Sequence, residues 1–167
     1  MKTKTFFLTT IMFVLILTCS TGIQAQTAKT NLDQVKLNQQ LLGKWEANVG
    51  MDTVEVWDCQ QYGKSSINYV SLIIKGKKSP LYIANNSIDS KEGNIKGFNL
   101  NASGDYITWI GLWITEKKFS IDLVQNFRPE TVYLKGELLF ETPTKMTFTL
   151  FNMDGIKTGE YKYNKVR

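Results

Sequence analysis

The stretch QQLLGKWEANVG, residues 39–50, contains the transition on which the interpretation of the whole chain depends. Before it, residues 27–42 have apolar side chains at helical spacing, with Asn31 as a candidate N-cap residue. These apolar positions are Leu32, Val35, Leu37, Leu41 and Leu42. Gly43 lies where a helix would end, because glycine is the usual residue just beyond a helix C-terminus. We therefore expect one short helix, followed by a first strand that begins near Gly43 and carries Trp45.

The remainder of the chain has the composition of β-strands separated by turns. Short runs rich in Val, Ile, Tyr, Phe, Trp and Thr recur about every ten residues. Glycine, proline, asparagine and aspartate separate them, as in KEGN at 91–94 and SGD at 103–105. No second long helical pattern interrupts the series, so βαβ units are not expected. The pattern predicts an all-β fold, an antiparallel meander of about 8–10 strands that closes into a barrel, with a sandwich as the alternative.

Alternation within the runs predicts one buried face on most strands. In KFSIDLVQNF, residues 118–127, the apolar side chains of Phe119, Ile121 and Leu123 alternate with polar ones. Residues 67–74 and 107–114 differ, because both of their faces are apolar. Either something covers the outside of the sheet there, or apolar residues line a cavity inside. The charged faces of most strands disfavour an outer-membrane barrel, which needs an apolar outer band on every strand.

A short helix, a Gly-x-Trp motif at residues 43–45 and a strand meander together resemble the lipocalins and the wider calycin group. The resemblance covers residues 26–167 as a pattern and rests on this one motif. It implies that Gly43 permits a sharp backbone entry and that Trp45 closes one end of the barrel. It also implies that a basic residue of the last strand packs over the tryptophan, with Lys162, Lys165 and Arg167 as the candidates. The alternative is a helix C-cap followed by an ordinary core aromatic residue.

Residues 1–25 have the organisation of a secretory signal peptide. Lys2 and Lys4 precede an apolar run at 6–17, and Ala25 ends a plausible cleavage site. The run is shorter than the roughly 20 apolar residues of a membrane-spanning helix. We expect a signal peptide at 1–25, a segment with a short helix at 26–42 and a β-barrel domain at 43–167. The protein would then be extracytoplasmic, periplasmic or secreted, of bacterial source, and without a stable membrane span after cleavage.

The two cysteines give two further expectations. A lipid anchor on Cys19 is the alternative to cleavage after Ala25, although Thr18 stands where lipoprotein processing normally requires a smaller residue. Cys59 would be the only cysteine left after cleavage, so it has no partner for an internal disulfide. Its apolar neighbours favour a buried thiol.

Charge and composition restrict the functions that the chain could have. It contains no histidine, which excludes Ser-His-Asp and Cys-His catalysis and the usual zinc sites. Removing residues 1–25 takes away two lysines and no acid, which leaves 18 basic against 15 acidic residues. These basic residues are scattered, apart from KGKK at 75–78, where we expect a solvated turn. No nucleic-acid partner is therefore expected.

The carboxylates show no arrangement typical of a hydrolase. Those that gather in the sequence are Asp52, Glu55, Asp58, Glu130, Glu137 and Glu141. Glu55 and Asp58 would point to opposite faces of one strand, whereas a two-acid mechanism needs carboxyl groups that face each other across a substrate. We expect these residues to be surface charges and the protein not to be an enzyme.

The run DYITWIGLWIT, residues 105–115, contains the strongest candidate for a binding site. Trp109 and Trp113 share a face with Gly111 between them, so two large rings flank a gap. They could form a pocket wall for an apolar or sugar ligand, or they could simply fill the core while the glycine relieves crowding. Tyr161 and Tyr163 in the last strand could add hydroxyl donors.

These patterns predict an exported protein that binds a small apolar or amphipathic ligand inside a barrel, without cofactor or metal. The ligand-binding candidates are Trp109, Trp113, Tyr161 and Tyr163. The alternative function is a non-enzymatic structural or protein-interaction module of the cell envelope, with a filled barrel.

Overall fold

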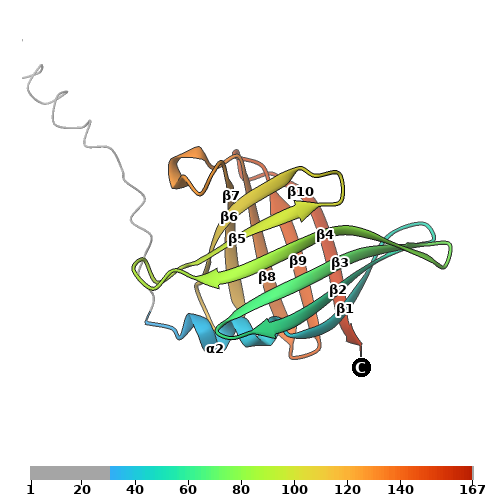
Figure 1. Ribbon diagram of the computed structural model, residues 1–167, viewed down its shortest axis with the longest axis horizontal. Helices are drawn as coiled ribbons and strands as arrows, with labels where there is room; N and C mark the ends of the chain where they lie inside the picture. Colours follow the sequence, from blue (N-terminus) through green and yellow to red (C-terminus); the bar gives the residue numbers. More distant parts are fainter. Residues whose placement is uncertain (1–30, 167) are drawn as a thin grey trace, which may run out of the picture.

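Ten antiparallel strands follow one another around a closed barrel (Figure 1). The computed structural model describes residues 31–166, so the signal-peptide and Cys19 expectations lie outside the described residues, as does Arg167. The strands are β1 (Gly43–Gly50), β2 (Thr53–Tyr62), β3 (Ser65–Ile74), β4 (Lys77–Ile88), β5 (Ile95–Asn101), β6 (Tyr106–Trp113), β7 (Lys118–Val124), β8 (Leu134–Thr142), β9 (Lys145–Phe151) and β10 (Lys157–Val166). Each pairs with its neighbour in sequence, and β10 pairs with β1. The predicted all-β meander and its closure are confirmed.

One short helix precedes the barrel, as predicted, but it is shorter than the apolar spacing suggested. Helix α2 (Gln34–Asn38) continues into a 3-10 turn, η1 (Gln39–Leu41). The predicted N-cap at Asn31 is wrong. Asp33 is the N-cap, because its carboxylate accepts a hydrogen bond from the backbone N–H of Lys36 at 2.9 Å.

A polar side chain attaches this helix to the end of the barrel. Gln34 is buried, and both ends of its amide bind the backbone of Trp113 at the end of β6. Its Nε2 donates to the Trp113 carbonyl at 3.1 Å, and its Oε1 accepts from the Trp113 N–H at 2.8 Å. The helix is thus joined to the sheet by the same type of bond that joins the strands.

Gly43 and Trp45 form the closed end of the barrel together with Lys165. Trp45 is 0% exposed, and its indole N–H donates to the Leu41 carbonyl at 2.8 Å. The ammonium group of Lys165 lies 5.0 Å from the centre of the Trp45 ring, a cation–π contact. Gly43 has a φ of +104°, and a Cβ there would lie 2.8 Å from the Lys165 side chain. Glycine therefore precedes the tryptophan because the backbone needs a positive φ and the lysine stem needs the space.

The strand register places the predicted apolar faces inside. Leu123, Ile121 and Phe119 of β7 face Trp109, Gly111 and Trp113 of β6. At the helix end, aromatic rings fill the interior. The ring centres of Trp45 and Phe140 are 5.7 Å apart in an edge-to-face contact, and the ring centres of Trp113 and Phe140 are 5.6 Å apart. These rings form the floor of the barrel.

The KGKK segment is a tight hairpin between β3 and β4. Ile74 pairs with Lys77, which leaves Lys75 and Gly76 as a two-residue loop. Both have positive φ angles, 50° and 79°, as a type I′ turn requires. The predicted solvated turn is confirmed.

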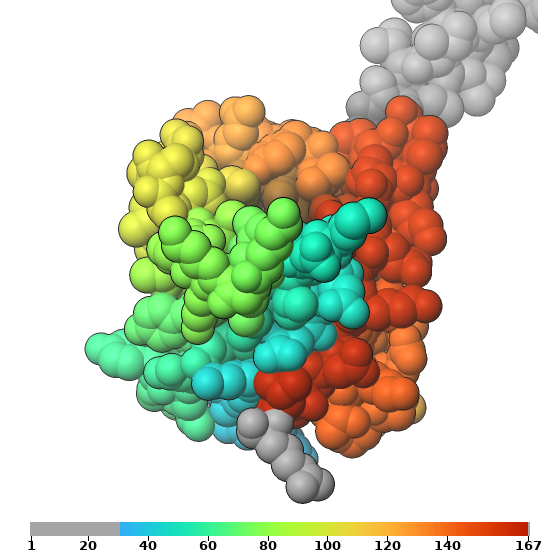
Figure 2. Space-filling model, turned by 90° about the vertical axis from the view of Figure 1, so that its right-hand side faces the viewer, coloured from blue at the N-terminus to red at the C-terminus, as the bar shows by residue number. Residues whose placement is uncertain are grey.

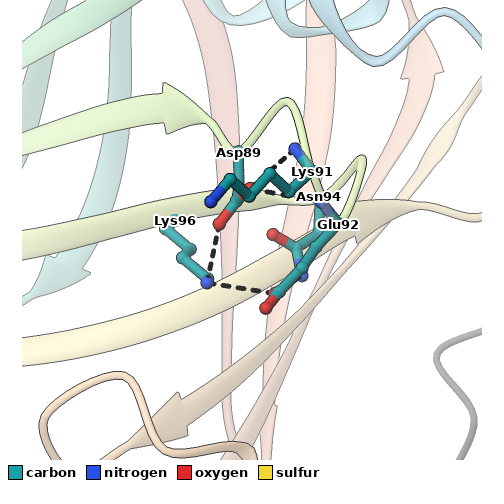
Figure 3. Close-up of polar contacts among 5 residues, drawn as sticks. All are labelled: Asp89, Lys91, Glu92, Asn94 and Lys96. Carbon is teal, nitrogen blue, oxygen red and sulfur yellow. Dashed lines mark hydrogen bonds and ion pairs between the residues drawn. The ribbon is translucent and has the colours of Figure 1, made fainter.

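The β4–β5 connection is held by a network of charged side chains (Figure 3). The Asp89 carboxylate accepts hydrogen bonds from the backbone N–H groups of Lys91 and Glu92 and from the Lys96 ammonium at 2.8 Å. Glu92 pairs with the same ammonium at 3.0 Å. These partners lower the pKa of Asp89 from 3.8 to about 2, and the Lys96 hydrogen bond has the largest effect.

Asp89→Asn is expected to remove part of the acid sensitivity of the fold. Because the folded pKa of Asp89 lies below its unfolded value, its stabilising effect is present above pH 4. That effect is lost as the pH falls toward 2. Urea midpoints measured from pH 6 to 2 should therefore fall less steeply for Asp89→Asn than for the wild type. Asp154→Asn, on the exposed β9–β10 turn, is the control. Parallel curves for all three proteins would contradict the network's role.

Candidate functional site

A cavity of about 200 Å³ lies inside the barrel, next to the aromatic floor. Its lining is divided into two walls. Strands β6–β9 supply a hydrocarbon wall, which includes Phe119, Ile121, Leu123, Leu134, Leu138 and Phe148. Strands β2–β5 supply a polar wall of Cys59, Asn68, Tyr82, Asn86 and Asn99. A mainly apolar enclosure with a few polar groups on one side is the usual design of a small-molecule site.

The polar wall contains no charged side chain, and hydrogen bonds fix the amide groups of two of its residues. Asn86 donates through Nδ2 to the Ser66 hydroxyl at 3.1 Å. Asn99 accepts through Oδ1 from the Trp109 indole at 3.1 Å. In each case one end of the amide is used, and the other end has no hydrogen-bond partner among residues 31–166. The wall therefore has hydrogen-bonding groups that remain available to a bound molecule.

Cys59 is a buried thiol on this wall, as the sequence predicted. It is 4% exposed and forms no disulfide. Burial raises the pKa of the thiol from 9.0 to about 11, although a hydrogen bond from Ser66 opposes the shift. Cys59 is therefore protonated at neutral pH and is not an activated nucleophile.

Glu55 lies inside the barrel, where the sequence analysis expected a surface charge. It pairs across the strands with Ala47, which is buried. Its Oε1 accepts hydrogen bonds from the Trp57 indole and, at 3.0 Å, from the Tyr163 hydroxyl. Burial, and then the Glu55 charge, raise the pKa values of Tyr163 and Tyr82. The expectation was wrong because a carboxylate with two close donors can be accommodated on an inward position. Asp58, as expected, lies outward, 3.8 Å from Lys44.

The four residues singled out as ligand-binding candidates occupy different parts of the interior. Trp109 lines the cavity. Trp113 is 0% exposed and belongs to the floor, with Phe119 5.2 Å away. The ring centre of Tyr163 lies 4.4 Å from that of Trp57, with the two planes tilted by 41°, and Tyr161 packs against the core from the same strand. The structure thus places Trp109 on a cavity wall, and places the other three beside the cavity rather than in its lining.

Sequence analysis missed the asparagines of the polar wall. Asn68, Asn86 and Asn99 occupy inward positions on three successive strands. Asparagine is depleted in β-strands, so its recurrence within the strand-like runs INYV, IANNSI and GFNLN was the available signal. Asparagine in a strand does not by itself indicate a binding site, because only the register between strands shows that the three side chains face one cavity.

Two features of the outer surface are also distinctive. One is a line of apolar side chains that pair in turn across β3–β6 and are each at least 45% exposed; we call it the outer apolar row. Its members are Tyr69, Ile83, Leu100 and Tyr106.

The other is the seam between β1 and β10. These strands share only three paired positions, and beyond these lies a hollow of about 510 Å³. Figure 2 faces this seam, where the red surface of β10 lies beside the cyan surface of β1. Exposed polar side chains such as Asn48 and Lys162 line the hollow, so it lacks the enclosed lining of the interior cavity.

Comparisons with known proteins add no family to this geometry. The chain matches no protein-family model, and no curated protein matches it significantly. Within residues 31–166, no helix has the length and apolar character needed to cross a bilayer. The same residues contain no group of three or more His, Cys, Asp or Glu side chains arranged as metal ligands.

Proposed function

We propose that the protein is an exported, lipocalin-like carrier that binds a small amphipathic molecule inside its barrel without transforming it. The observation that carries this proposal is the interior cavity with one hydrocarbon wall and one uncharged polar wall. Export is supported by the signal-peptide pattern of residues 1–25, and the lipocalin likeness by the Gly43-x-Trp45 motif and the closed meander. Binding without chemistry is supported by the protonated Cys59 and by the pairing of Glu55 with Trp57 and Tyr163.

The cavity volume limits the size of the ligand. Drug-sized sites occupy about 300–1,000 Å³, so a cavity of about 200 Å³ calls for something smaller. A dry cavity of about 150 Å³ is known to hold benzene. A single substituted ring, with its apolar edge toward Ile121 and Leu138, therefore fits this cavity.

Native mass spectrometry of the protein from its own producing cells tests the proposal. We expect an excess mass that disappears after solvent extraction and identifies the cargo. Ala84→Leu, which places three more carbon atoms on the cavity wall, should abolish the excess mass. Ala102→Leu, on the exposed β5–β6 turn, should retain it. A wild-type protein that carries no cargo and takes up no small aromatic ligand when one is supplied would contradict the proposal.

The outer apolar row favours a second candidate function, a protein-interaction module of the cell envelope. Contiguous apolar side chains on a surface commonly mark a contact site. Sedimentation equilibrium would test self-association through this face. If a second copy binds there, Ile83→Lys should shift a wild-type dimer to the monomer. A wild-type protein that is monomeric at high concentration would exclude this form of the second function.

A further inference from the structure

Three residues of the polar wall lie in one row across β3, β4 and β5. Asn68 pairs directly with Ala84, and Ala84 pairs directly with Asn99. Facing residues of antiparallel strands have Cα atoms about 5 Å apart, so the two asparagines are separated by about 10 Å. Only the methyl group of Ala84 lies between them. The row therefore has an amide at each end and free space in the middle, on the surface of the cavity.

The orientation of the Asn99 amide is set by a neighbouring indole. Trp109 Nε1 lies 3.1 Å from Asn99 Oδ1, and an indole nitrogen can only donate. The oxygen of Asn99 must therefore face Trp109, which leaves the NH₂ group for another partner. No residue in 31–166 accepts from that group. Asn99 consequently offers a hydrogen-bond donor at its end of the row.

Asn68, at the other end, is an amide without a protein partner. It is 7% exposed, and its Oδ1 is shut off from solvent with no hydrogen bond to any residue in the described part of the chain. Its Nδ2 is likewise without a partner in 31–166. A buried amide that makes no hydrogen bond is unfavourable, and a molecule bound over Ala84 with a hydrogen-bond acceptor would give the Asn68 NH₂ group a partner.

The rest of the lining restricts the character of that molecule. No acidic or basic side chain of residues 31–166 lines the cavity, so an ion placed there would lose its hydration without a counter-charge. Tyr82 lies on the same wall, and its hydroxyl makes no hydrogen bond to the described residues. Within the described part of the chain, the free donors on this wall are the NH₂ groups of Asn68 and Asn99 and the Tyr82 hydroxyl, and the free acceptors are the amide oxygens of Asn68 and Asn86. A carbonyl oxygen, which accepts through two lone pairs and carries no charge, is complementary to the two NH₂ groups that flank Ala84.

We propose that Asn68, Ala84 and Asn99 form a seat for the carbonyl oxygen of a neutral, ring-sized ligand. This proposal rests on the ligand-binding function proposed above. The carbonyl oxygen lies over the Ala84 methyl group and accepts from the two amides. The ring then lies against Ile121 and Leu138 on the opposite wall.

Two probes of nearly identical shape test the seat. Acetophenone carries a carbonyl oxygen where α-methylstyrene carries a CH₂ group. Calorimetric titration should show that Asn68→Leu weakens acetophenone binding about fivefold to tenfold, the net worth of one neutral hydrogen bond. The same substitution should leave α-methylstyrene binding within about twofold or improve it, because leucine has the same branched arrangement of heavy atoms as asparagine and no polar group. Asn48→Leu, on the exposed face of β1, should change neither affinity.

A measurement on the wild type keeps the test independent of any variant's folding. The carbonyl stretch of bound acetophenone should move to lower frequency than in hexane, as hydrogen bonding requires. Asn99→Asp retains an acceptor for Trp109 but removes the NH₂ donor, so it should reverse part of this shift. If both probes bind but the stretch is unshifted and Asn68→Leu affects them equally, the seat is overturned while the carrier function stands. If neither probe binds the wild type, the seat is overturned, and the carrier function fails with it when the protein from its producing cells also carries no cargo.

Discussion

Gly97→Ala is expected to lower the free energy of unfolding by about 3 kcal/mol or more, an unusually large effect for one methyl group. Gly97 faces inward on β5, directly opposite Trp109 of β6. A Cβ at this position would overlap the backbone carbonyl oxygen of Asn85 and the indole ring of Trp109. The carbonyl belongs to the backbone of β4, a strand that is paired on both sides, and the indole donates a hydrogen bond to Asn99. Neither group can therefore move away from an added methyl group without a loss of stability.

Chemical unfolding followed by far-UV circular dichroism measures this effect. Gly50→Ala is the matched control, because the nearest atom to a Cβ there is Thr53 Cβ at 3.7 Å, an ordinary contact. We expect Gly50→Ala to unfold within about 0.5 kcal/mol of the wild type. Equal midpoints for the two variants would show that Trp109 does not lie over Gly97.

The same arrangement recurs around the barrel. Phe119 lies over Gly111, and Phe148 lies over Gly136, so that a Cβ on either glycine would crowd the ring. The sequence pattern predicts a gap at Gly111, between Trp109 and Trp113, with room for a ligand. The β6–β7 register pairs Gly111 with Ile121, and the ring of Phe119, which faces Trp113, leans over the glycine and fills that gap instead. Inward glycines covered by aromatic rings from the next strand are thus part of how this core is packed.

Features that depend on neighbours along the chain were predictable from the sequence, and features that depend on neighbours across strands were not. Period-two alternation and turn residues depend on neighbours along the chain, so the meander, the inward face of β7 and the tight turn at Lys75 and Gly76 could be predicted. The cavity depends on neighbours across strands. Asn99 meets Trp109, and Glu55 meets Tyr163 more than 100 residues away, only because the barrel closes in one register. Linear order does not contain that register, so the polar wall could not be predicted.

Substitutions of Trp45 should change the stability of the closed end of the barrel without changing the affinity for a ligand. Trp45→Ala is expected to cost about 3–5 kcal/mol, because it removes a fully buried ring and leaves a void beside Phe140. It also deprives the Leu41 carbonyl of its indole donor and Lys165 of its cation–π partner.

Two further variants, Trp45→Phe and Lys165→Met, separate the contributions to the loss of unfolding free energy in Trp45→Ala. Trp45→Phe keeps an aromatic ring against Phe140 but loses the hydrogen bond to Leu41, so it should cost about 1–3 kcal/mol. Lys165→Met keeps the stem but removes the charge, and should cost about 1 kcal/mol or less. Unfolding midpoints give all three values. Trp45 belongs to the floor and not to the cavity lining, so Trp45→Phe should also bind acetophenone with wild-type affinity. Weaker binding in this folded variant would mean that the floor and the cavity are coupled, because a change in the floor could then reach the ligand only by moving the cavity walls.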